Sequence, residues 1–260
     1  MPNAEAVFET ACATHTGLVR EHNEDNFLHH PDVDLWAVAD GMGGHEGGEV
    51  ASAAVVDALR QVAPAHDARS LLADCEARLA QANHFVREAA ETRGKGTMGT
   101  TVVALLAHGA NFACLWSGDS RAYLVRNRVV IPVSRDHSEV QELVTQGVLS
   151  EEEARKWPRR NVITRAIGIF EEPSLELRQG ALQDEDVFVL CSDGLTGHVE
   201  DCEILARVNG YPPADACRAL VELTLERGAR DNVTVIVVRC RLKRNMTLQI
   251  PALAAKLWGA

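Results

Sequence analysis

The chain has 260 residues, of which 46% are hydrophobic and 24% charged, values that are ordinary for a globular protein. Its formal net charge of −11 argues against a nucleic-acid-binding protein, which needs a basic patch to neutralise phosphates. No apolar stretch approaches the roughly 20 residues of a membrane span, and the N-terminus lacks the pattern of a secretory signal. We therefore expect a cytoplasmic protein with no membrane span and no nucleic-acid partner.

The seven cysteines support the same location. Their number is odd and no C-x-x-C pair occurs. Several lie inside apolar runs, where cysteine behaves as a small hydrophobic residue. This usage is typical of a reducing compartment and argues against both a disulfide framework and a zinc site.

The N-terminal part of the chain predicts two strands separated by a polar segment. Residues 8–16 have the pattern of a strand that leads into a polar loop over residues 15–26. Residues 35–39 form a short apolar run that predicts a buried strand. The following segment, residues 40–48, is too rich in glycine for the interior of a helix or a strand.

Two helices and a series of short strands follow. A helical pattern begins at Glu49 and ends before Pro64, and a second covers residues 68–92 with one apolar stripe. After a glycine turn at residues 94–96, four short segments rich in β-branched residues predict antiparallel hairpins. These four segments are residues 101–107, 111–117, 121–126 and 129–133.

The C-terminal part returns to helices and strands. Residues 138–157 are polar with a helical pattern, and strands are predicted at residues 187–191 and 233–240, with a helix around Ala216 and Leu220 between them. Runs of strands interrupted by helix pairs, without regular β-α alternation, favour an α+β fold. The chain shows no internal repeat and no clear linker, so we expect one domain.

Four aspartates lie where an apolar run meets a turn: Asp40, Asp119, Asp193 and Asp231. Acidic residues at strand ends are a rigid way to hold hard cations, and ligand sets made only of oxygen favour Mg²⁺, Mn²⁺ or Ca²⁺ over zinc. An aspartate before glycine is also a common turn residue. The residues alone therefore leave open both a metal centre and four separate turns.

The polar loop contains a guanidinium close to two carboxylates, in the segment Arg20–Asn26 with Glu24 and Asp25. The planar fork of arginine matches phosphate oxygens in a bidentate manner. Taken alone, the segment is equally compatible with a solvated surface loop.

Eight short motifs together resemble one protein family. The motifs, in chain order, are Thr16-Gly17…Arg20…Asn23-Glu24-Asp25, Val38-Ala39-Asp40-Gly41-Met42-Gly43-Gly44, Gly99-Thr100-Thr101, Gly118-Asp119-Ser120-Arg121, Asp136-His137-Ser138, Ile163-Thr164-Arg165-Ala166-Ile167-Gly168, Ser192-Asp193-Gly194-Leu195 and Ala229-Arg230-Asp231-Asn232-Val233-Thr234. With these motifs the chain is similar to metal-dependent protein serine/threonine phosphatases of the PPM, or protein phosphatase 2C, family, and is nearest its bacterial branch.

The resemblance implies an α+β fold, a β-sandwich of two antiparallel sheets flanked by helices on both sides, with the metal site at one edge. It implies a catalytic domain over residues 1–242 that contains a mobile flap at about residues 138–160. Residues 243–260 would form a C-terminal tail. The apolar residues of that tail allow either a short docking helix or a frayed end.

The resemblance also implies roles for the acidic residues. Asp40 would bridge two metal ions, Mn²⁺ or Mg²⁺, and the Gly41 carbonyl would be a ligand of one of them. Asp193 and Asp231 would bind the other ion, and Asp119, together with Asp193, would bind a third, weaker ion. Glu24 and Asp25 would act through metal-bound waters.

The implied reaction is hydrolysis of phosphoserine and phosphothreonine by direct attack of a water or hydroxide that bridges the metals. Arg20 would bind the phosphate, and Arg20, Asp40 and Asp193 would be the catalytic residues. No covalent enzyme intermediate is needed, so Cys191 is expected to be a core residue without a catalytic role.

One position departs from many eukaryotic members of the family. They carry a histidine after the Asp-Gly pair, as a candidate general acid, whereas this chain has Met42, which cannot donate a proton. His45 lies nearby between glycines, and its direction is not predictable from the sequence. His137 is expected to order the loop before the flap rather than to act in catalysis.

The resemblance suggests a monomeric signalling enzyme that acts on phosphorylated proteins and opposes a bacterial serine/threonine kinase. Regulation of type VI secretion is one setting that it allows. Two alternatives stay open: a catalytically silent module that binds phosphoproteins, and a phosphatase of the same fold that acts on small phosphate esters.

Overall fold

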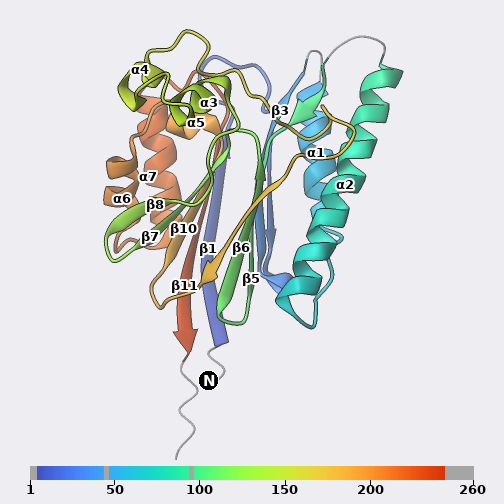
Figure 1. Cartoon of the computed structure of the whole chain (residues 1–260). Coiled ribbons are helices and arrows are strands. Elements are labelled where there is room, and N and C mark those ends of the chain that lie inside the picture. Colours follow the sequence, from blue (N-terminus) through green and yellow to red (C-terminus); the bar gives the residue numbers. More distant parts are fainter. Residues whose placement is uncertain (1–4, 44–46, 94–96, 244–260) are drawn as a thin grey trace, which may run out of the picture.

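The computed structural model describes residues 5–43, 47–93 and 97–243. It consists of two stacked antiparallel sheets with helices against both outer faces (Figure 1). Sheet A contains, in spatial order, β1 (Glu5–His15), β11 (Val233–Lys243), β10 (Val187–Cys191), β7 (Arg121–Arg126) and β8 (Val129–Pro132). The order in sheet B is β2 (Asp25–His30), β3 (Leu35–Met42), β5 (Val102–His108), β6 (Asn111–Ser117) and β9 (Glu176–Ala181), with β4 (Gly99–Thr100) also paired to β3. The predicted α+β sandwich is thus confirmed.

Helices cover each sheet on its outer face. Sheet B packs against α1 (Gly47–Leu59) and α2 (Ala68–Thr92), and sheet A packs against α7 (Pro213–Glu226) and α6 (Asp201–Val208). The short helices α3 (Glu139–Thr145), α4 (Glu151–Arg155) and α5 (Asp193–Thr196) gather at one end of the sandwich (Figure 1). A 3-10 turn, Pro31–Val33, connects β2 to β3.

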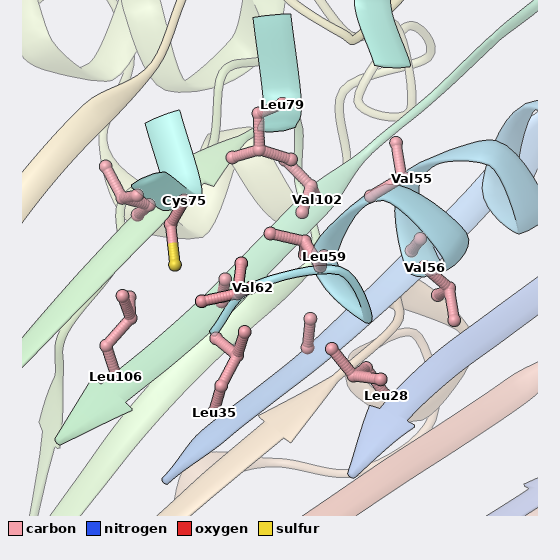
Figure 2. Packing of buried hydrophobic residues seen from close by; sticks show 14 of the residues in the cluster. Leu28, Leu35, Val55, Val56, Leu59, Val62, Cys75, Leu79, Val102 and Leu106 are labelled. Carbon is pink, nitrogen blue, oxygen red and sulfur yellow. The ribbon is translucent and has the colours of Figure 1, made fainter. Parts of the chain in front are cut away.

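The alternation of side chains along β3 separates two hydrophobic cores. Leu35 and Ala37 face the helices, whereas Trp36 and Val38 face the other sheet. Successive side chains of a strand point to opposite faces, so a strand buried on both sides reads as an unbroken apolar run. Figure 2 shows the helix-side core, in which strand residues meet side chains of α1, of α2 and of the connection between these helices: Leu28, Leu35, Val102, Leu106, Val55, Val56, Leu59, Val62, Cys75 and Leu79.

The first and last strands of the described chain lie side by side. β1 pairs antiparallel with β11 along its whole length, from Glu5 opposite Lys243 to His15 opposite Val233. The register places the polar loop that follows His15 next to the segment that precedes Val233. Two candidate site residues far apart in sequence, Arg20 and Asp231, are thereby brought to the same end of sheet A.

The element boundaries agree with the sequence in some places and differ in others. The helix over residues 68–92 is confirmed as α2. The predicted helical segment over residues 138–157 is two short helices, because Gly147 has a positive φ of 72° and Ser150 starts α4 with a capping box. Neither β2 nor β9 was predicted: polar residues make up at least half of each strand, and both lie at the edges of sheet B.

Some predictions fall outside the described residues. They concern His45, the turn at residues 94–96 and the tail from residue 244 onward. β11 extends to Lys243, one residue past the predicted domain boundary. None of the helices built from the described residues is sufficiently long and apolar to cross a membrane.

Candidate functional site

The candidate acidic residues come together at the end of the sandwich that carries α5. Asp25, the first residue of β2, pairs across the strands with Asp40 near the end of β3. Asp193 is the first residue of α5, directly after β10, and Asp231 lies just before β11. Asp119 belongs to the turn between β6 and β7. Charge interactions link the other four carboxylates to Asp40.

The backbone of Asp40 is fixed by two threonines, Thr100 at the end of β4 and Thr101 directly after it. Its N–H donates to Thr101 Oγ1 at 3.0 Å. Its carbonyl oxygen accepts from the Thr101 N–H and from Thr100 Oγ1, both at 2.9 Å. Burial raises the pKa of Asp40 well above its usual value, and the neighbouring carboxylates raise it further. A rigid, desolvated carboxylate of this kind requires positive charge in order to ionise.

Asp25 is buried beside Asp40, its partner on the neighbouring strand, and only one of its two carboxylate oxygens accepts hydrogen bonds. Its Oδ2 accepts hydrogen bonds from Ser192 Oγ at 2.8 Å and Thr234 Oγ1 at 2.7 Å. Its Oδ1 is buried without a hydrogen-bond partner among the residues that the structure describes. Burial raises the pKa of Asp25 to about 7, although the two hydroxyl groups oppose the shift. Buried polar atoms are rarely left unpaired, so the free oxygen indicates a ligand or an ordered water.

The pKa values of Asp193 and Asp119 are raised in the same way. Burial raises the pKa of Asp193 to about 6, with a further contribution from Asp231. Burial also raises the pKa of Asp119 to about 8, and Asp193 adds to that shift. Like charges gathered in a buried site raise one another's pKa values, and bound cations reverse this effect.

Asp231 differs because it is more exposed and already paired. Its Oδ2 accepts a hydrogen bond from Arg20 Nη2 at 2.7 Å, and its Oδ1 accepts one from the Asn232 N–H at 2.9 Å. The two predicted roles, phosphate binding by Arg20 and metal binding by Asp231, therefore fall on residues in direct contact. The side chain of Arg20 is 51% exposed, so its remaining N–H groups are accessible from solvent.

Asn232 holds the polar loop against this edge of the sheet. Its Nδ2 donates to the carbonyl oxygens of Thr16 at 2.8 Å and His22 at 2.9 Å. Its Oδ1 accepts from the Glu24 N–H at 2.8 Å. Because Asn232 is nearly fully buried, these bonds fix the loop that carries Arg20 and Glu24. Burial raises the pKa of Glu24 as well.

Gly41 occupies a position where a side chain has no room. A Cβ built there would collide with the carbonyl oxygens of Gly48 and Glu24. The Gly41 N–H donates to the Glu24 carbonyl at 3.1 Å. The close approach of three backbone segments at this point keeps the carbonyl of Gly41 near Asp40 and Glu24.

His137 connects the turn that carries Asp119 to the segment before α3. Its ring is buried, and the ring Nδ1 accepts a hydrogen bond from the Gly118 N–H at 3.2 Å. The backbone N–H of His137 donates to the Gly118 carbonyl at 2.9 Å. Its Nε2 lies 3.2 Å from Glu176 Oε1. The contacts suit an ordering residue. Cys191 is a buried core residue whose pKa burial raises to about 12.

The chemistry of the donors fits divalent cations of the Mg²⁺ and Mn²⁺ type. All are oxygens, one buried carboxylate oxygen has no partner among the described residues, and burial together with neighbouring carboxylates raises the pKa values of Asp25, Asp40, Asp119 and Asp193. Within the described ranges, no three Asp, Glu, His or Cys side chains converge tightly enough to hold one ion by themselves. Asp231 contributes to this, since both of its oxygens are engaged by Arg20 and Asn232.

Several supporting residues were not predicted as part of the site. Ser192, Thr234 and Asn232 stand beside the candidate aspartates in the sequence, which is the one signal that could have identified them. Their partners, Asp25 and the loop around Glu24, are about 200 residues away in the chain: the Ser192–Asp25 bond spans 167 residues and the Asn232–Glu24 bond 208. Such pairings become visible only in the folded structure.

Comparison with known proteins agrees with this geometry. Residues 16–244 match the family described as Protein phosphatase 2C. The serine/threonine protein phosphatase PstP of Mycobacterium tuberculosis is 37% identical over 239 residues, which cover 91% of this chain and 46% of PstP. The chain thus spans about half the length of this curated relative.

Two solved structures are also similar over nearly the whole chain. One is PppA, described as a key regulatory component of T6SS in Pseudomonas aeruginosa, with 41% identity, a TM-score of 0.86 and coverage of 92% of this chain and 100% of that one. The other is the catalytic domain of PstP in complex with two manganese ions, with 36% identity, a TM-score of 0.81 and coverage of 91% and 99%. The chain belongs to the protein phosphatase 2C family.

Proposed function

We propose that the chain is a Mn²⁺- or Mg²⁺-dependent protein serine/threonine phosphatase that hydrolyses phosphoserine and phosphothreonine without a covalent enzyme intermediate. The observation that carries the proposal is the group of buried and partly buried carboxylates with raised pKa values at one end of the sandwich, next to the guanidinium of Arg20. Family membership and the two manganese ions in the PstP catalytic domain support it.

The carboxylates divide into ligands and supports. Asp40 and the Gly41 carbonyl would hold one ion, and Asp40, Asp193 and Asp231 the other. Asp25 and Glu24 would accept hydrogen bonds from waters around the ions. When bound, two divalent ions make a water molecule acidic enough, with a pKa near roughly 7, to act as the nucleophile. The part played by the chain is to fix Asp40 through Thr100 and Thr101.

Arg20 would bind the phosphoryl group and stabilise the charge that develops on its oxygens. Within the described residues, Arg20 donates a hydrogen bond to Asp231 through its Nη2. Guanidinium has five N–H donors, so a phosphate can share Arg20 with Asp231. Asp231 in turn holds the guanidinium at the mouth of the site.

The leaving alkoxide must receive a proton from a group other than Met42, whose thioether has none to donate. His137 is buried and its Nδ1 is occupied by the Gly118 N–H. We therefore assign the proton to a water molecule at the site and assign to His137 the ordering of the turn before Asp119.

The decisive experiment is an assay of a phosphothreonine peptide with Mn²⁺, with EDTA, and with the Asp193→Ala variant. We expect turnover with Mn²⁺ and loss of activity in the other two conditions, because Asp193 supplies a ligand that no neighbouring residue replaces. Full activity in EDTA would refute the proposal.

The silent phosphoprotein-binding module is less well supported, because such a protein has no need of the complete set of buried aspartates. Calorimetric titration with Mn²⁺ separates the two possibilities, since a silent module would show no tight divalent site. The small-ester phosphatase makes a different prediction, namely a higher kcat/KM on small phosphate esters than on a phosphopeptide.

Asp119→Ala is expected to remove a third, weaker metal site and slow turnover about 10-fold or more, while the two tighter sites keep their ions. The reason is that Asp119 lies on the β6–β7 turn and that Asp193 is the carboxylate of the cluster with the largest charge interaction with it. Manganese titration by calorimetry should lose only the weakest binding step. A variant that lost all metal binding would show that Asp119 belongs to the core pair.

The biological setting is also a proposal. The resemblance to PppA, described as a regulatory component of T6SS, supports a role in the control of type VI secretion, in opposition to a serine/threonine kinase. Incubating the phosphatase with the autophosphorylated kinase of the same organism, and following the loss of phosphothreonine, tests this. The monomeric state and the cytoplasmic location stay predictions that sedimentation and cell fractionation can check.

A further inference from the structure

Exposed large apolar side chains are concentrated in a few segments of the chain. Of the eleven large hydrophobic residues that the structure shows as exposed, six lie in three segments: Leu18, Val19, Val148, Val162, Ile169 and Phe170. These segments are the loop with Arg20, the flap and the stretch after the flap. Exposed apolar groups that gather at one place indicate a surface that contacts another molecule.

Two of the apolar residues near the site meet each other. A Cβ built on Gly99 would lie 2.9 Å from Met42 Cε and 3.0 Å from Ile169 Cδ1. Because both tips approach the same point, the two side chains come together above the backbone of β4, where the absence of a side chain at Gly99 leaves room for them. We call this pair, Met42 and Ile169, the apolar shelf.

The shelf lies on the same side of β3 as the catalytic carboxylate. Residues two apart on a strand point to the same face, and Asp40 and Met42 are two apart at the end of β3. At about 3.4 Å per residue, the shelf is therefore roughly 7 Å along the strand from Asp40. One or two residues of an extended chain span that distance.

The segment that carries Ile169 is held in place from two sides. Thr100 exchanges backbone hydrogen bonds with Ile167, at 3.0 and 2.9 Å. On the other side Asn83 of α2, which is nearly fully buried, accepts from the Gly168 N–H and donates to the carbonyls of Phe170 and Glu171. Figure 1 shows this loop, in yellow, reaching across to α2. Ile169 is thus 37% exposed on a fixed backbone.

We propose that the apolar shelf of Met42 and Ile169 binds the side chain next to the phosphorylated residue of a protein substrate and selects apolar residues there. The proposal rests on the proposed phosphatase function and deepens it. A rigid apolar surface one or two residues from the phosphate site gains contact area from a polypeptide whose neighbouring side chain is apolar.

The test uses three substrates with the complete chain and Mn²⁺: an aryl phosphate and two phosphothreonine peptides that carry either leucine or glutamine on both sides of the phosphothreonine. The wild type should prefer the leucine peptide by about 10-fold in kcat/KM, which corresponds to about 1.4 kcal/mol. In Ile169→Ser the preference should fall to about 2-fold. Val129→Ser, at an exposed apolar position on β8, should keep the wild-type preference.

A second variant tests whether the substrate preference can be reversed rather than only lost. Ile169→Lys should reverse the selection, so that a peptide with glutamate on both sides becomes a better substrate than the leucine peptide. An equal kcat/KM for the two wild-type peptides, or an unchanged preference in both Ile169 variants, would overturn the shelf while leaving the phosphatase function intact. Failure to hydrolyse any phosphopeptide would overturn both proposals.

Discussion

Asp40→Asn is expected to lower turnover by on the order of 1,000-fold, which corresponds to about 4 kcal/mol of lost transition-state stabilisation. Asp40 is the carboxylate that interacts with all the others, and an amide cannot bridge two cations as a carboxylate does. The same variant should lose the rise in melting temperature that Mn²⁺ gives the wild type, since ligands that bind the folded state stabilise it. A steady-state assay and thermal unfolding with and without Mn²⁺ measure the two effects.

The metal-free form of the same variant should be more stable than the metal-free wild type at pH 8. Burial and neighbouring carboxylates raise the pKa of Asp40 in the folded state. The folded protein therefore binds a proton there more tightly than the unfolded chain, and its stability falls as the pH rises above the unfolded value of about 3.9. Asparagine has no such charge, so the greater stability of the metal-free variant relative to the metal-free wild type should disappear near pH 4.

Asp57→Asn is the matched control. Asp57 lies on the exposed side of α1 and pairs with Arg60. We expect neither activity nor the manganese-dependent shift to change in this variant. If Asp40→Asn kept a wild-type manganese-dependent rise in melting temperature, Asp40 would not be a metal ligand.

Asp186→Ala is expected to destabilise the fold by about 3–5 kcal/mol, the usual cost of leaving one member of a buried ion pair without its partner. Asp186 is 1% exposed and binds Arg126 in a bidentate manner, at 2.7 Å to Nε and 2.6 Å to Nη2. It also accepts a hydrogen bond from the Gln183 N–H at 2.7 Å. Denaturant unfolding of the metal-free protein measures the loss.

The neighbouring residue provides the comparison. Glu185 pairs with Arg241 at 2.8 Å, and both side chains are more than half exposed. Exposed ion pairs contribute about 0–1 kcal/mol, so Glu185→Ala should change the free energy of unfolding by less than about 1 kcal/mol. If Asp186→Ala had an equally small effect, the contacts of Asp186 would contribute little to stability.

Periodic apolar patterns made much of the fold predictable. The stripe of α2 and the β-branched runs of β5 to β7 identified these elements, because burial on one or both faces leaves a clear signature. β2 and β9 were missed because pairing with a neighbouring strand, rather than a pattern of their own, makes them strands. Their residues are mostly polar.

The site was predictable as a set of residues but not as an arrangement. The eight motifs identified the acids and Arg20, and the structure brings these acids to one end of the sandwich. That Asp231 pairs with Arg20, and that Asn232 fastens the loop around Glu24, depends on the register of β1 against β11. No local pattern encodes a register between strands so distant in sequence.

The pairing of β1 with β11 also has a consequence for biosynthesis. β11 lies between β1 and β10, so sheet A stays interrupted until β11 has left the ribosome. Asp231 and Asn232 directly precede that strand, so the bond between Arg20 and Asp231 and the bonds between Asn232 and the loop form only when it is in place. Domains fold as units during synthesis. We therefore expect a truncated chain without residues 231–243 to lack the contacts that hold the loop of Arg20 at the proposed site.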